Sequence, residues 1–295
     1  MRARDVAILI LLGGIWGVSY PLIRVAAPPI GPIPLALARV LLAILVLGPL
    51  ALASGALPDV RGRWRAYLFV AGINLAIPFG LVGTAHLTVS ASFGAVVVTT
   101  APLFAAIGSA LLLGERLTAQ RIVGLLTGTV GVAIVLGWGP PEADADVALA
   151  TTFLLLAGLC YGAGAVAVRA LFVGTAARTL AFAQQVGAAL LLLPAALVWP
   201  HDRFDLSAGP LLAVLALGLL CTAAAYLMYF HLLATIGPTR TLTVTILTPC
   251  FGVLWGSLLL GERLSAAALL GMAVVLVGVA LVNGLVPRLD FSDRD

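Results

Sequence analysis

Long apolar runs, separated by short polar segments, make up most of the sequence. Ten of them span residues 6–25, 33–53, 67–87, 91–113, 121–138, 148–172, 179–199, 210–233, 239–260 and 264–286. Runs of about 20 apolar residues have the length at which an α-helix crosses the hydrocarbon core of a bilayer. The runs lack the alternation that is typical of a transmembrane β-strand. The pattern predicts an all-α integral membrane protein with ten transmembrane helices.

Composition supports this interpretation. The chain is 62% hydrophobic and only 9% charged, whereas soluble domains carry about 25% charged residues. So few charges cannot cover a water-facing surface, which argues against a soluble protein. We therefore expect the lipid bilayer to be the main partner of the chain.

One nine-residue segment occurs twice, as LLLGERLTA from Leu111 and as LLLGERLSA from Leu258, 147 positions apart. The same separation relates Pro102 to Pro249, Phe104 to Phe251 and Gly124 to Gly271, and a separation of 145 relates Trp16 to Tyr161 and Arg24 to Arg169. The chain is therefore predicted to consist of two five-helix repeats, residues 1–147 and 148–295. Because five is odd, the second repeat would enter the membrane from the opposite side. Inverted repeats are typical of secondary transporters that work by alternating access.

The repeated segment itself has the chemistry of a tight turn. Gly114 and Gly261 are expected to end a helix in the left-handed conformation. Glu115 and Glu262 are expected to accept hydrogen bonds from backbone amides at a helix start. The segment indicates architecture rather than substrate.

The chain resembles the EamA-type members of the drug/metabolite transporter superfamily. The resemblance rests on the paired P-x-F … LLLGERL-[ST] segments at residues 102–118 and 249–265, and on IWGVSYPLIR at residues 15–24. It covers the whole chain. It implies ten membrane spans, cytoplasmic termini and carriage of small metabolites such as amino acids or their derivatives, commonly as an exporter.

Arginines predict the orientation. All 16 basic residues are arginines. Of these, 12 fall in segments on the same side as the N-terminus, three fall on the other side, and Arg39 lies within the second run. Because basic residues concentrate in cytoplasmic loops, we expect a protein of the cytoplasmic (inner) membrane with both termini inside.

Prolines mark two candidate breaks in the predicted spans. Pro102 and Pro249 fall near the middle of the fourth and ninth runs, where proline leaves the carbonyls of Val98 and Thr245 without their helical partners. Helices interrupted at matching depths in both repeats are typical of a transport site. The alternative is that both prolines merely kink their helices for packing.

Polar and aromatic residues inside the spans are the other candidates. Trp16, Ser19 and Tyr20 share one helical face, which suggests a cavity lined by rings and a few polar groups, although aromatic packing would give the same pattern. Arg39 is the only charged residue well inside a span, and Gln184 stands at the matching position. An arginine fork suits a carboxylate; the alternative is that Arg39 extends to the lipid headgroups.

The predicted substrate-binding residues are Trp16, Ser19, Tyr20, Arg39, Thr99, Pro102, Tyr161, Gln184, Tyr226, Thr245, Pro249 and Trp255. Asn74 is expected to form an interhelical hydrogen bond. His86 and His231, near the ends of their runs, are expected at the membrane interface; the alternative is that they carry protons.

Several functions are disfavoured. No Asp or Glu lies in the middle of a run, which argues against an antiporter of cations and protons. The motifs of an intramembrane enzyme are also missing. The prediction is a secondary transporter that exports amino acids or related compounds; the alternative is a channel or a non-transporting membrane scaffold. We expect a small-molecule substrate that bears a carboxylate, with no cofactor, no metal and no nucleic acid. The oligomeric state is left open.

Overall fold

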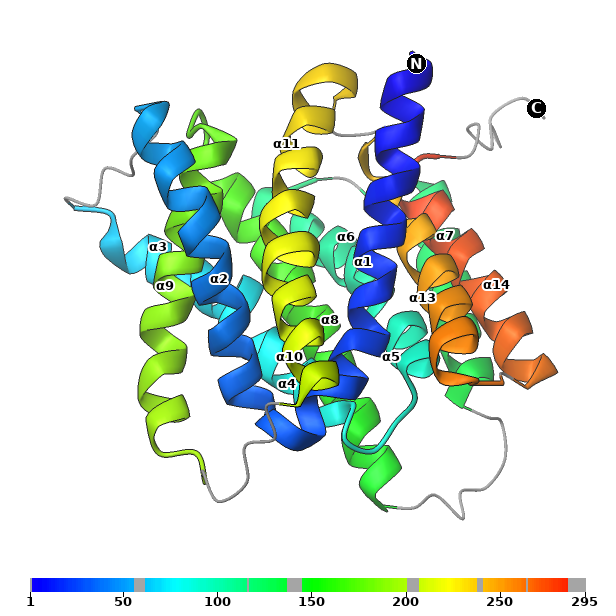
Figure 1. The fold of residues 1–295 in the computed structure, drawn as a ribbon. Coiled ribbons are helices and arrows are strands. Elements are labelled where there is room, and N and C mark those ends of the chain that lie inside the picture. Colours follow the sequence, from blue (N-terminus) through cyan, green and yellow to red (C-terminus); the bar gives the residue numbers. More distant parts are fainter. Residues whose placement is uncertain are drawn as a thin grey trace, which may run out of the picture.

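The fold is a bundle of helices that run between two ends (Figure 1). The computed structural model describes residues 2–55, 62–115, 117–136, 145–200, 207–237, 241–263 and 265–285, and every regular element in these ranges is helical. We call the end at which α1 begins the upper end, as drawn in Figure 1; α14 finishes at the same end.

Each predicted span coincides with a helix or with a consecutive group of helices. The first five are α1 (Ala3–Ile30), α2 (Pro32–Ala53), α3–η1–α4 (Trp64–Ala71, Gly72–Ala76, Ile77–Ala85), α5–α6 (Ala91–Val98, Ala101–Leu113) and α7 (Ala119–Leu136). The others are α8 (Ala145–Leu171), α9 (Ala177–Leu197), α10–η2–α11 (Ala208–Leu215, Ala216–Ala224, Ala225–Ile236), α13 (Val244–Leu260) and α14 (Ala266–Val282). The span ends predicted at residues 138, 239, 264 and 286 lie outside the described residues.

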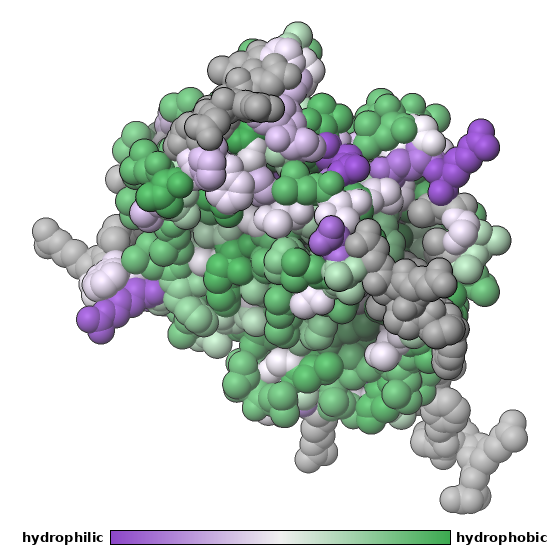
Figure 2. All heavy atoms as spheres, turned by 90° about the horizontal axis from the view of Figure 1, so that it is seen from below, coloured by the Kyte–Doolittle hydropathy of each residue, from purple (hydrophilic) through white to green (hydrophobic). Residues whose placement is uncertain are grey.

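The surface of the bundle suits lipid. Seven helical stretches are long and apolar enough to cross a membrane, and three further apolar helices are shorter. Large side chains point outward without cover: Leu45, Leu111 and Leu112 are 70%, 78% and 76% exposed. Seen along the bundle from below, hydrophobic residues form most of the visible surface and hydrophilic ones only separate groups (Figure 2). In water this much exposed apolar area would be a liability. The predicted all-α integral membrane protein is confirmed.

Two spans contain π-helical segments, in which the backbone hydrogen bonds span one residue more than in an α-helix. They are η1, between α3 and α4, and η2, between α10 and α11. Such segments are rare and occur frequently at functional sites. Nothing in the apolar pattern of these runs predicts them.

The two candidate proline breaks turn out differently. The fourth span is interrupted at Thr99 and Thr100, directly before Pro102 in the first turn of α6. In the ninth span, α13 continues through Pro249, and the turn lies earlier, at residues 242–243. The expectation of interruptions at matching depths is therefore wrong. Side chains help to satisfy the backbone near Pro249, where the Thr248 hydroxyl donates to the Val244 carbonyl.

Glycines allow α1 and α8 to approach their partner helices closely. Gly17 of α1 lies against the backbone of Phe251 and Gly252 in α13, and a Cβ at Gly17 would collide with it. Gly162 of α8 lies in the same way against Phe104 and its neighbours in α6. Close packing at small residues holds helices together in lipid, where no hydrophobic effect drives them together.

The two repeated turns end their helices as expected. Gly114 follows α6 with φ +67°, and Gly261 follows α13 with φ +66°. A residue with a side chain would be strained in this left-handed conformation.

Candidate functional site

Arg39 is buried inside the protein rather than extended toward lipid headgroups. It lies on α2, seven residues after Pro32 at the lower end, which is about 10 Å along the helix, and it is only 9% exposed. Its Nε donates to the hydroxyl of Thr222 at 2.7 Å, and its guanidinium lies 4.1 Å from the centre of the Phe79 ring. Arginine stacks favourably on aromatic rings. Thus the headgroup alternative is wrong.

A second polar pair joins η1 to α9. Asn74 donates from Nδ2 to Oε1 of Gln184 at 3.0 Å, so the predicted interhelical bond of Asn74 is confirmed. Gln184 is 6% exposed and lies seven residues after Ala177, where α9 begins at the upper end. Thr222 belongs to η2 and Asn74 to η1. Each π-helical segment therefore supplies one partner of a buried polar pair.

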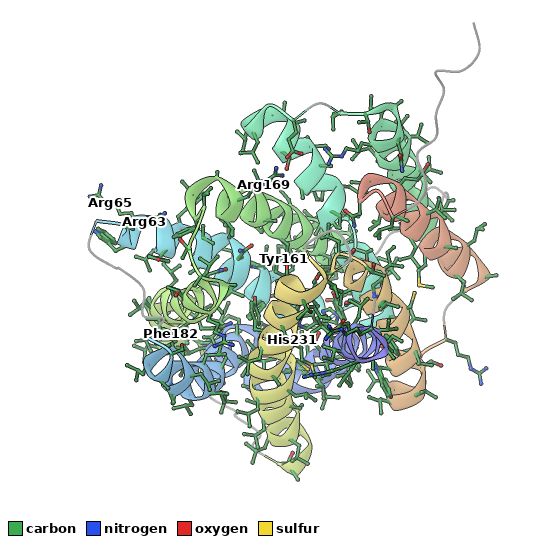
Figure 3. All side chains as sticks on the ribbon, turned by 90° about the horizontal axis from the view of Figure 1, so that it is seen from above. Arg63, Arg65, Tyr161, Arg169, Phe182 and His231 are labelled. Carbon is green, nitrogen blue, oxygen red and sulfur yellow. The ribbon has the colours of Figure 1, made fainter. Side chains whose placement is uncertain are left out.

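Three tyrosines approach Arg39. Tyr20, Tyr161 and Tyr226 each lie close enough to interact electrostatically with its guanidinium, and Tyr161 also interacts with the other two tyrosines. They come from α1, α8 and α11. Figure 3, drawn from above, places Tyr161 near the middle of the bundle, with Arg63 and Arg65 at its rim. We call Arg39 and these tyrosines the tyrosine–arginine cluster.

No carboxylate pairs with Arg39 in the part of the chain that the structure describes. The two ion pairs found there join Glu115 to Arg121 and to Arg169. Of the guanidinium nitrogens of Arg39, only Nε has a hydrogen-bond acceptor among the described residues. An unpaired buried cation is costly, so the two Nη groups are suited to an anionic ligand.

Trp16 and Ser19 lie next to the cluster on α1. The Trp16 ring is 5.6 Å from the ring of Tyr229, and the Ser19 hydroxyl donates to the Trp16 carbonyl at 2.5 Å. The structure thus brings the predicted residues of α1, α2, α8 and α11 into one region.

The predicted residues of the fourth and ninth spans have local partners instead. The hydroxyl of Thr99 donates to the Ala95 carbonyl at 2.8 Å, and that of Thr245 donates to Leu242 and accepts from Asn283. Trp255 donates from Nε1 to the carbonyl of Gly14 at 3.1 Å. Trp255 therefore joins α13 to α1. No contact places Pro102 or Pro249 in the cluster.

His86 differs most from expectation. It follows α4 at the lower end, as the sequence indicated, but its side chain is fully buried and not interfacial. His231 is half-buried.

Two site residues escaped the sequence-based selection. Phe79 carried no signal, because a phenylalanine in an apolar run is ordinary. Thr222 is one of many threonines in the apolar runs, and its role as the partner of Arg39 depends on η2. Gln185 is fully buried, and its amide has no partner within the described residues.

A family model connects this architecture with known proteins. The model described as EamA-like transporter family matches the chain twice, at residues 5–137 and 148–284. The chain belongs to the EamA-like transporter family. It is accordingly a multi-pass membrane transporter of small molecules and not an enzyme. The prediction that the lipid bilayer is a partner of the chain is thereby confirmed.

Relatives of this EamA-like transporter carry compatible descriptions. The inner membrane transporter YedA of Escherichia coli is 29% identical over 91% of this chain and 87% of its own. A WAT1-related chloroplastic protein of Arabidopsis thaliana is 27% identical over 91% of this chain, which spans 66% of that protein. A probable terminal-alkyne amino-acid exporter of Streptantibioticus cattleyicolor is 24% identical over 93% of this chain and 92% of its own.

A solved structure shares the fold. A crystal structure that is 19% identical in sequence superposes with a TM-score of 0.71, covering 98% of this chain and all of the other. At this identity the likeness concerns the fold alone.

Proposed function

We propose that this EamA-like transporter is a secondary exporter of amino acids or related compounds that bear a carboxylate. It acts by alternating access in the cytoplasmic membrane. The observation that carries the proposal is Arg39, buried beside three tyrosines without an acidic partner among the described residues. A planar guanidinium forms two parallel hydrogen bonds with a carboxylate, and a substrate carboxylate supplies the missing negative charge.

The remaining cluster residues suit the rest of such a molecule. Tyr20, Tyr161 and Tyr226 offer rings with a polar end, and Gln184 with Asn74 offers amide groups, a mixture typical of small-molecule sites. The described relative from Streptantibioticus cattleyicolor, a probable exporter of an amino acid, supports this substrate class. We extend the site to the other predicted positions, Trp16, Ser19, Thr99, Pro102, Thr245, Pro249 and Trp255, as residues that line or shape the pathway.

Paired contacts support two inverted repeats, residues 1–147 and 148–295. Arg39 on α2 with Thr222 on η2 has its counterpart in Gln184 on α9 with Asn74 on η1. Gly17 against Phe251 has its counterpart in Gly162 against Phe104. These pairs follow the separations of 145 to 148 positions that relate the two halves, and the family model matches each half once. Two such halves can rock about a shared central site.

The arginine distribution supports cytoplasmic termini. With the upper end inside, 12 of the 16 arginines lie on the cytoplasmic side, as basic residues do in membrane proteins. In this orientation the Arg39–Thr222 pair lies nearer the outer surface and the Asn74–Gln184 pair nearer the cytoplasm.

Transport by the purified protein in proteoliposomes tests the proposal. We expect countertransport of a radiolabelled amino acid that saturates with concentration; flux that never saturates would indicate a channel, and no flux for any amino acid would overturn the proposal. Arg39→Met should lower uptake of the amino acid about 100-fold, the size expected for losing a charged hydrogen-bonded pair. Uptake of the corresponding amide should change little.

Two variants control for indirect effects. Arg39→Lys should recover part of the uptake, because the charge remains while the two-pronged geometry is lost. Gln184→Met changes the matched position without changing charge, so it should affect acid and amide alike. Equal loss of acid and amide uptake in Arg39→Met would show that Arg39 serves structure.

A further inference from the structure

At the lower end, Glu262 joins the turn after α13 to the start of α5. Its Oε1 accepts from the backbone N–H of Ala91 at 2.7 Å. Its Oε2 accepts from the backbone N–H of Ser92 at 2.9 Å and from the Ser92 hydroxyl at 2.6 Å. We call these three hydrogen bonds the Glu262 clamp. A carboxylate on the free amides of a helix start is favoured by both hydrogen bonding and the helix dipole. The clamp therefore holds α5 against the α13–α14 turn.

The matching glutamate at the upper end has other partners. Glu115 accepts from Arg121 at 3.1 Å and pairs with Arg169 at the end of α8. The hydrogen bond from Arg121 lowers the pKa of Glu115. These side chains are partly exposed, at 35% for Arg121 and 64% for Arg169. The two ends of the molecule are thus fastened in different ways.

His86 is buried directly behind the clamped helix. Its ring fills the space beside Gly94 of α5, where no Cβ would fit. Its Nδ1 lies 2.7 Å from the carbonyl oxygen of Val82. A carbonyl only accepts, so Nδ1 carries the hydrogen and Nε2 holds the lone pair. Nε2 is buried and has no partner among the described residues.

Burial disfavours a positive charge on His86 in this arrangement, although some of its neighbours favour one. From α1, Arg24 donates to the His86 backbone carbonyl and Tyr20 lies 5.9 Å away, ring to ring. The backbone of Ala91 and the carboxylate of Glu262 face it from α5 and the α13–α14 turn. Burial is the main cause that lowers the pKa of His86 from 6.5 to about 4, and Arg24 acts in the same direction. The Val82 carbonyl, Glu262 and the backbone of Ala91 raise this pKa, but they do not outweigh the burial. His86 is therefore neutral while the clamp is closed.

We propose that His86 is a proton-binding site that controls opening of the outer end: Nε2 takes a proton from the outer solution when the Glu262 clamp releases α5. Release of α5 from His86 would expose Nε2 to water, which solvates the imidazolium. The proton therefore binds the open form more tightly and stabilises it. Because Tyr20 belongs to the tyrosine–arginine cluster, opening here would also give the substrate a way out. The inference rests on the proposed alternating access, but it needs no particular substrate.

The direction of the pH effect follows from linkage. The open form should titrate near the ordinary value of 6.5 and the closed form near 4. Above about pH 7, a change of pH does not alter the ratio of open to closed form. Between about pH 6.5 and 4, each fall of one pH unit raises this ratio by at most about tenfold.

Exchange of the imidazole C2 hydrogen with deuterium, followed by mass spectrometry of the peptide that contains His86, measures the pKa of this one histidine. The experiment uses the full-length protein without substrate. We expect a pKa well below 6.5 in the unaltered protein. Loss of the Glu262 charge alone would lower this pKa slightly, so a rise toward 6.5 in Glu262→Ala reports the opening of the clamp. Glu115→Ala, the matched change at the upper end, should leave the pKa of His86 unchanged.

Accessibility of α5 gives the reciprocal measurement, since coupling between two sites acts equally in both directions. Cys160, Cys221 and Cys250 are replaced by serine, and Val96→Cys, at a position that is 3% exposed, is labelled from outside with an impermeant thiol reagent. The labelling rate of Val96→Cys is divided by the labelling rate of the exposed Ser265→Cys. The division corrects for the effect of pH on the reactivity of the thiol. The ratio should rise as pH falls below 6.5, and His86→Gln should abolish this dependence.

Two results would overturn the inference. One is a His86 pKa that is the same in Glu262→Ala, in the milder Glu262→Gln and in the unaltered protein. The other is a labelling ratio at Val96→Cys that does not depend on pH, or depends on it equally with and without His86. Neither measurement involves transport. A negative result for His86 would therefore not contradict the proposed export of amino acids, and a negative transport result would not affect the interpretation of these two measurements.

Discussion

The turns at Glu115 and Glu262 have nearly the same sequence but different surroundings. Both follow a glycine in the left-handed conformation that ends a helix. Glu262 then accepts three hydrogen bonds from the start of α5, whereas Glu115 pairs with two arginines. Local sequence therefore determines the turn, and the surrounding structure determines what its glutamate binds.

The same contrast appears in the middle of the bundle. Arg39 and Gln184 stand at matching positions, and each bonds to a π-helical segment. Only Arg39 carries a charge. The first of these pairs thus places a cation near one end of the bundle, and the second places a neutral amide near the other end. If the two halves are repeats, as we propose, their residues give the proposed pathway a polarity that their shape does not.

The largest expected effect concerns which side of the membrane each turn faces. In a cysteine-free background, Ser265→Cys should react with an impermeant thiol reagent added to intact cells, and Thr118→Cys should not. The reason is the odd number of spans between the two turns. If both cysteines reacted from the same side, the proposed inverted repeats would be wrong, and the two turns would not be counterparts on opposite faces of the membrane.

A smaller difference is expected in stability. Glu262→Ala leaves two backbone amides at the start of α5 without an acceptor, which should cost about 2 kcal/mol. Glu115→Ala removes partly exposed ion pairs worth about 1 kcal/mol or less. Thermal unfolding in detergent should therefore show a lower melting temperature for Glu262→Ala, with a drop at least twice that of Glu115→Ala. A larger drop for Glu115→Ala would mean that the upper end is the more tightly held.

The smallest effect separates the two prolines. Pro249→Ala lets α13 form the hydrogen bond to the Thr245 carbonyl that proline cannot make, and it should raise the melting temperature slightly. Pro102 lies in the first turn of α6, where an amide has no helical partner anyway, so Pro102→Ala should change stability by less than about 0.5 kcal/mol. Equal shifts would indicate that both prolines have the same role, despite the continuous α13.

The sequence predicted the helices well, because an apolar run long enough to cross lipid leaves the backbone no alternative to a helix. Gly114 and Gly261 were predictable from turn chemistry. Arg39 was found because a charge inside an apolar run is conspicuous and costly.

Other features depend on contacts that no local pattern records. The partner of Glu262 lies about 170 positions earlier in the chain, at Ala91 and Ser92. The π-helical segments η1 and η2 have no counterpart in the apolar pattern of their runs. His86 looked interfacial from its place in the sequence, and only the position of Gly94 across from it shows that α5 covers the ring. The hydrogen bond of Trp255 to Gly14 was equally invisible, because it joins helices 241 residues apart.

The two polar pairs also bear on how such a site can be assembled. Arg39 and Asn74 belong to the first half of the chain, and their partners, Thr222 and Gln184, belong to the second. Neither half contains a complete pair. Both polar pairs therefore depend on contacts between the first and the second half of one polypeptide. Co-expression of the two halves as separate chains should therefore restore both pairs, and neither half alone can do so.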